Sequence, residues 1–107
     1  MYTFEEFLQL FEQNKLGIQY EDGPAFANIC KTIDDLGFKD VNGDFDSSLK
    51  AAEHWKDKYD ILTADGREIV FWRRSPFENI PGHSIIEAAQ IDNGAEGELD
   101  ELLGVTL

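Results

Sequence analysis

The hydrophobic residues at the start of the chain recur at i, i+3, i+4 and i+7, the spacing that places side chains on one face of an α-helix. The residues concerned are Phe4, Phe7, Leu8 and Phe11. Thr3 precedes this run and Glu6 follows three residues later, which is typical of a capping box at a helix start. The pattern therefore predicts a helix that begins after Thr3 and ends near residues 15–17.

Two further segments have helical character. Gly-Pro at 23–24 suits the first turn of a helix and Gly37 suits its end, so we expect a helix between them. Its apolar stripe consists of Phe26, Ile29, Cys30 and Ile33. Residues 47–58 are expected to form a third helix, capped by Asp46 or Ser47.

The pattern then changes to that of strands. Residues 59–73 contain two runs rich in β-branched and aromatic residues that flank Ala-Asp-Gly, which indicates a hairpin. The second run, Ile69–Trp72, is apolar on both faces, so we expect it to be covered on both sides at the centre of the fold. Residues 38–47 contain Asn-Gly, a pair favoured in two-residue turns, and form a candidate second hairpin that would extend the sheet.

The C-terminal part is predicted from shorter signals. Residues 75–84 contain two prolines and a glycine, which indicates a loop. Residues 85–91 and 98–104 are expected to form short helices. The chain as a whole, residues 1–107, is predicted to be a single α+β domain in which two or three amphipathic helices pack on a short antiparallel sheet.

Charge adds the main functional signal. The chain has 22 Asp and Glu against 9 Lys and Arg, a net charge of −13, and residues 75–107 hold seven acids without any Lys or Arg. Such a field repels polyanions and attracts cationic surfaces, so we expect a basic protein partner and neither direct nucleic-acid binding nor membrane binding. The competing explanation is that the acidity serves solubility alone.

The sequence also bears on the compartment. The N-terminus is acidic where a signal peptide would be basic, and no apolar run approaches the roughly 20 residues that span a membrane. A single cysteine, Cys30, cannot form an internal disulfide. We therefore expect a cytoplasmic protein.

A calcium loop is the metal site with the most ligand positions matched in the sequence. Asp40, Asn42 and Asp44 match the first three ligand positions of such a loop, but Phe45 stands where glycine is needed and Ala51 where the bidentate glutamate is needed. A turn followed by a helix cap explains the same residues better, and no cofactor is predicted.

Catalytic groups are sparse. Cys30 lies on an apolar stripe, where a thiol is usually a core residue, and nothing in the sequence connects it to His54 or His83, the two candidate bases. No phosphate-binding loop, dinucleotide-binding glycine pattern or serine nucleophile elbow is present. The prediction is that the protein is not an enzyme.

One short basic stretch interrupts the acidity. Trp72 is followed by Arg73 and Arg74, a combination that also occurs at anion sites. Carboxylates surround these residues in excess, so we expect them and Arg67 to pair with acids of this chain, among them those of the acidic C-terminal segment.

The favoured hypothesis is a small inhibitor or immunity-type protein that neutralises a basic partner such as a nuclease, toxin or DNA-binding protein, with anti-defence DNA mimicry as a variant. Carboxylates on helix faces can replace phosphates in a groove lined by Lys and Arg. The candidate contacts are Glu21, Asp22, Asp34, Asp35, Asp40, Asp44, Asp46, Glu96, Glu98, Asp100 and Glu101.

Two alternatives remain open. A regulatory or scaffold subunit would bind through an apolar patch, formed by Leu99, Leu102 and Leu103 or by the Phe71-Trp72 strand. A calcium-binding module would use residues 40–46.

Overall fold

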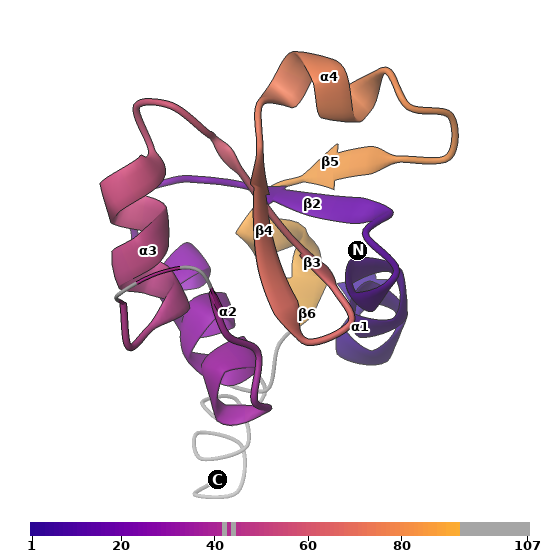
Figure 1. Ribbon diagram of the computed structural model, residues 1–107. Helices are drawn as coiled ribbons and strands as arrows, with labels where there is room; N and C mark the ends of the chain where they lie inside the picture. The colour runs from indigo at the N-terminus through magenta and orange to yellow at the C-terminus, as the bar shows by residue number, and fades with distance from the viewer. Residues whose placement is uncertain (42, 44, 93–107) are drawn as a thin grey trace, which may run out of the picture.

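The computed structural model describes residues 1–41, 43 and 45–92. These residues form a four-stranded sheet with helices on both faces and a separate two-stranded pair (Figure 1). The helices are α1 (Phe4–Glu12), α2 (Pro24–Asp35), α3 (Ser48–Trp55) and α4 (Arg74–Glu78), with a 3₁₀ turn η1 (Ala88–Gln90). The strands are β1 (Tyr2–Thr3), β2 (Leu16–Gln19), β3 (Ile61–Asp65), β4 (Glu68–Trp72), β5 (Ser84–Ile86) and β6 (Ile91–Asp92). The predicted α+β class is confirmed.

The sheet has the order β4-β3-β2-β5. β3 and β4 form the predicted hairpin, in which Asp65 lies opposite Glu68 and Gly66 opens the turn with φ +62°. β2 pairs antiparallel with β3 but parallel with β5, so the sheet is mixed rather than wholly antiparallel. β4 lies at an edge, and the expectation that it forms the centre of the fold was wrong; β2 and β3 occupy that place.

The core lies between the sheet and the helices α1 and α2. Phe7 and Phe11 of α1 are fully buried and their rings pack 4.9 Å apart. The opposite face of the sheet receives Phe77 of α4, which lies over Gly17 of β2. A Cβ at Gly17 would collide with the γ2 methyl of Ile61 and would stand 3.2 Å from the Phe77 ring, so only glycine fits here without movement.

The helix starts follow the sequence signals closely. Thr3 and Glu6 form both hydrogen bonds of the predicted capping box, at 3.0 and 3.1 Å. α2 begins at Pro24 and Gly37 follows its last turn with φ +92°, as predicted. The predicted and observed helix ends agree because residues close in the chain form the hydrogen bonds that the backbone groups at a helix end need.

α1 ends earlier than predicted. Asn14 adopts a left-handed φ of +61°, its N–H donates to the carbonyl of Phe11, and the N–H of Lys15 donates to the carbonyl of Leu10, each at 3.0 Å. This pair of bonds is a Schellman motif, and it stops the helix before Leu16. Leu16 can therefore begin β2, a strand that the sequence analysis did not predict.

Four other expectations need correction or restriction. Within residues 75–84 the predicted loop begins as helix α4, and residues 85–91 form β5, η1 and β6 instead of a helix. Among the described residues of 38–47 no second hairpin forms, and only Lys39 extends the sheet, through a bridge to Glu68. The helix predicted for 98–104 lies outside the described residues.

Within the described part of the chain, the structure contains no helix long and apolar enough to cross a membrane.

Candidate functional site

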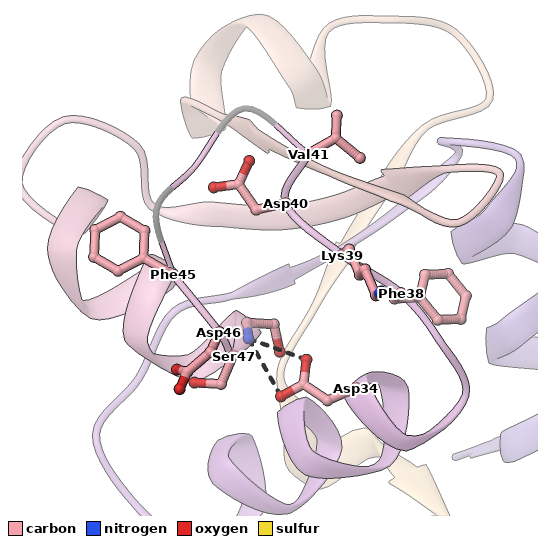
Figure 2. Close-up of a pocket in the computed structure, with 9 residues that line it drawn as sticks. Asp34, Phe38, Lys39, Asp40, Val41, Phe45, Asp46 and Ser47 are labelled. Atoms are coloured by element: carbon pink, nitrogen blue, oxygen red, sulfur yellow. Dashed lines mark hydrogen bonds between the residues drawn. The ribbon is translucent and has the colours of Figure 1, made fainter.

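The connection between α2 and α3 borders a pocket of about 360 Å³ (Figure 2). Three carboxylates line it, those of Asp34, Asp40 and Asp46. They share the pocket with the buried Phe38 and with Val41, of which 58% is exposed. The structure thus brings together acids from the end of α2 and from the following loop, which the sequence analysis named among its candidate contacts.

Asp34 is the most firmly held of the three. Its carboxylate accepts the backbone N–H of Ser48, the first residue of α3, at 3.0 and 3.2 Å (Figure 2). The hydroxyl of Ser48 donates to the carbonyl of Cys30 on α2, and Ser47 caps α3 by accepting from Lys50, as predicted. Asp34 therefore joins two helices and supplies a negative charge at the positive end of α3.

Asp35 and Asp46 have a different environment. Asp35 pairs with Lys31 at 3.4 Å and Asp46 with Lys50 at 3.1 Å, and both carboxylate side chains are at least 70% exposed. Exposed pairs of this kind contribute about 0.5 kcal/mol or less, so a partner can compete for these carboxylates at little cost.

Asp40 shapes the loop. Its carbonyl accepts the N–H of Gly43 at 3.3 Å, and a Cβ at Gly43 would collide with its carboxylate. The predicted two-residue turn at 42–43 includes a residue outside the described part of the chain, so that turn stays a prediction. Among the described residues no group of three His, Cys, Asp or Glu could hold a metal ion. Asn42 and Asp44 lie outside the described residues, so the calcium interpretation stays a prediction.

The remaining predicted contact residues are not part of this pocket. Glu21 and Asp22 precede α2 and lie at the opposite end of this helix from Asp34 and Asp35. Asp22 accepts a hydrogen bond from the hydroxyl of Tyr20 at 2.8 Å. Burial, together with this bond, raises the pKa of Tyr20 to about 12. Asp44, Glu96, Glu98, Asp100 and Glu101 lie outside the described residues.

Cys30 has the core role that its position predicted. It is buried on α2, and burial raises the pKa of its thiol to about 12, so very little thiolate exists near neutral pH. His54 contacts Phe45 and Trp55, while His83 contacts Phe77 on the other face of the sheet. The geometry of these residues favours packing over nucleophilic chemistry.

The arginines pair within the chain in two of three cases. Arg67 lies 3.0 Å from Glu12, and Arg74 lies 3.2 Å from Glu78, which belongs to the acidic C-terminal segment. Arg73 forms no ion pair with another described residue. It borders a second, basic hollow that the sequence analysis missed, because its lysines lie more than a dozen residues away in the chain.

Comparisons with protein-family models, with curated proteins and with solved structures found no match for this chain. Its function is therefore argued from the geometry and charge of the described residues.

Proposed function

We propose that this protein binds a basic protein through its acidic surface and thereby inhibits or neutralises it. The face proposed for the contact is the edge where α2 meets the α2–α3 loop, called here the acidic edge and formed by Asp34, Asp35, Asp40 and Asp46. A partner surface rich in Lys and Arg, such as the substrate groove of a nuclease, has the complementary charge.

The excess of carboxylates carries this proposal. Even if all 9 basic side chains paired with acids of this chain, 13 carboxylates would remain without a counter-charge. The four ion pairs found among the described residues lie at the surface, where solvent weakens them. The chain therefore presents a negative field that its own fold does not neutralise.

The acidic edge has further features of a protein contact. Leu36 and Val41 are 43% and 58% exposed beside Asp35 and Asp40, which adds apolar surface to the charge. Asp34 is held by Ser48, so part of the edge is rigid before any partner arrives. A preformed surface loses less conformational entropy when it binds.

The test uses the immobilised protein to capture partners from a lysate at about 0.1 M salt and elutes them at about 1 M salt. This change in salt concentration shortens the Debye length from about 10 Å to about 3 Å, which weakens charge–charge attraction. We expect a basic protein in the eluate, and we expect the purified protein to inhibit its action on a polyanionic substrate. An affinity for the purified partner that is equal at both salt concentrations would contradict the proposal.

Paired variants locate the contact. Asp35→Asn with Asp46→Asn removes two exposed carboxylates from the acidic edge, and Glu5→Gln with Glu78→Gln removes two elsewhere with the same change in net charge. We expect the first pair to weaken binding at least about tenfold, roughly 1.4 kcal/mol, and the second to leave it within about twofold. Equal losses would place the contact elsewhere.

The apolar alternative predicts a different outcome from the same capture. Trp72 packs edge-to-face against Phe77 with ring centroids 5.5 Å apart, and Phe71 packs on the core, so both side chains already have contacts within the chain. Leu99, Leu102 and Leu103 lie outside the described residues. A partner retained at about 1 M salt would favour this alternative.

A further inference from the structure

Hairpin pairing brings together two basic segments that are separate in the sequence. Residues 56–60 connect α3 to β3, and residues 73–75 comprise the link between β4 and α4 and the first residues of α4 (Figure 1). The N–H of Asp60 donates to the carbonyl of Trp72 at 3.1 Å, and the N–H of Arg74 donates to Oδ1 of Asp60 at 2.9 Å. These bonds fix the two segments on either side of a hollow of about 470 Å³.

Positive charge is concentrated in this hollow. Four basic side chains line it, those of Lys56, Lys58, Arg73 and Arg74. The hollow that they line is called here the basic hollow. They are four of the nine basic residues of a chain whose net charge is −13. Two acids also line the hollow, Asp57 and Asp60, and Asp60 already accepts the Arg74 N–H. The lining therefore has an excess of cations where the chain overall has an excess of anions.

Among the described residues, only one of these four cations, Arg74, forms an ion pair with a carboxylate. The guanidinium of Arg74 is positioned by Glu78 at 3.2 Å and by the side-chain carbonyl of Gln19 at 2.6 Å. These two contacts leave three of its five N–H donors for other acceptors. Arg73 has no ion pair to another described residue.

Within the described part of the chain, the two lysines approach aromatic rings and form no ion pair with a carboxylate. Lys56 lies 5.9 Å from the ring centroid of Tyr20, and Lys58 lies 5.4 Å from that of Tyr59. A cation over a ring keeps its charge and its hydrogen-bond donors available to an anion, whereas a carboxylate partner would neutralise it.

We propose that the basic hollow binds a small ligand through a phosphoryl group. Guanidinium groups match phosphate oxygens in pairs of hydrogen bonds, and lysines add point charge, so a cluster of both types suits a multiply charged oxyanion. A volume of about 470 Å³ lies within the range of small-molecule sites. The acids elsewhere on the protein oppose the ligand only weakly, since charges more than about 8 Å away are screened at physiological salt.

The test is a titration of the isotope-labelled protein with a phosphate probe, in which NMR records the chemical shifts of the backbone amides. Inorganic pyrophosphate is the first probe and ATP the second, which separates an inorganic phosphate from a nucleoside phosphate as the source of the phosphoryl group. We expect saturable shifts at Lys58, Arg74 and Ser75 with at least one probe, and smaller ones along α1. The proposal would be overturned if neither probe gave saturable shifts at concentrations up to about 10 mM. A Kd of that size corresponds to a binding free energy of roughly 3 kcal/mol.

Matched variants decide whether the site is local. Lys58→Gln with Arg73→Gln should weaken binding at least about tenfold, whereas Lys15→Gln with Lys39→Gln, with the same change in net charge, should change it by less than about twofold. Equal weakening by both pairs would show general charge attraction and would overturn the proposal. These measurements follow binding of a phosphate probe and not of a basic protein, so they stand or fall separately from the proposed protein partner.

Discussion

The carboxylate of Asp34, near the end of α2, holds the backbone N–H of Ser48 at the start of α3. Its neighbour Asp35 is exposed, and among the described residues its carboxylate pairs with Lys31 alone. Two adjacent acids that look equivalent in the sequence therefore have different roles: the half-buried Asp34 joins two helices, whereas Asp35 is exposed.

This difference predicts unequal costs of removal. Asp34→Ala leaves the Ser48 N–H without its acceptor and removes a charge from the positive end of α3, so we expect a loss of about 1 to 2 kcal/mol of unfolding free energy. Asp35→Ala breaks one exposed ion pair and should cost less than about 0.5 kcal/mol. Urea unfolding measures both values, and equal losses would contradict the role given to Asp34.

The contact between Gly17 and Ile61 predicts an energetic coupling. Gly17→Ala places a methyl group against the γ2 methyl of Ile61, and we expect a loss of about 1 to 3 kcal/mol. Ile61→Leu removes that methyl at nearly constant volume, so the double variant should be more stable than the sum of the single changes predicts, by at least about 0.5 kcal/mol. Simple additivity in thermal or urea unfolding would show that the two residues do not clash.

The raised pKa of Tyr20 predicts a loss of stability in alkali. The unfolded chain releases this proton near pH 10, whereas the folded protein keeps it until about pH 12, because burial and the bond to Asp22 favour the neutral phenol. Between these values the folded state binds more protons, so the contribution of Tyr20 is complete below pH 10 and the free energy of unfolding falls as the pH rises through this window.

Phenolate absorbance and unfolding at increasing pH measure this effect. Tyr20→Phe should lack the titration at about pH 12 and the part of the pH dependence that belongs to it. A Tyr20→Phe protein with the same alkaline titration as the parent would contradict the assignment.

Local signals explain which elements could be predicted. The capping box of Thr3 and Glu6, the stop at Gly37 and the turn at Gly66 satisfy backbone groups within a few residues, so their pattern is visible in the chain. β5 could not be recognised in this way. Ile85 and Ile86 suit either a helix or a strand, and only pairing with Gly17 and Ile18 of β2 decides between them.

The candidate sites show the same limit. Composition predicted an acidic surface, but it could not show that Glu21 and Asp22 lie at one end of α2 while Asp34 and Asp35 lie at the other. The sequence also has Arg73 next to Arg74, but it does not reveal that Lys56 and Lys58 line the same hollow. Both arrangements depend on contacts between segments that the chain order does not specify.

The sequence by itself determined the starts of the three longer helices, the β3–β4 hairpin and the net charge of −13, because each depends on neighbouring residues or on composition alone. The tertiary structure decided which carboxylates hold the fold together and which face solvent, and it assembled the basic hollow. The physical reason is that the Asp34–Ser48 and Asp60–Arg74 hydrogen bonds each join residues 14 positions apart in the chain. They exist only when helix packing and strand register bring these residues together.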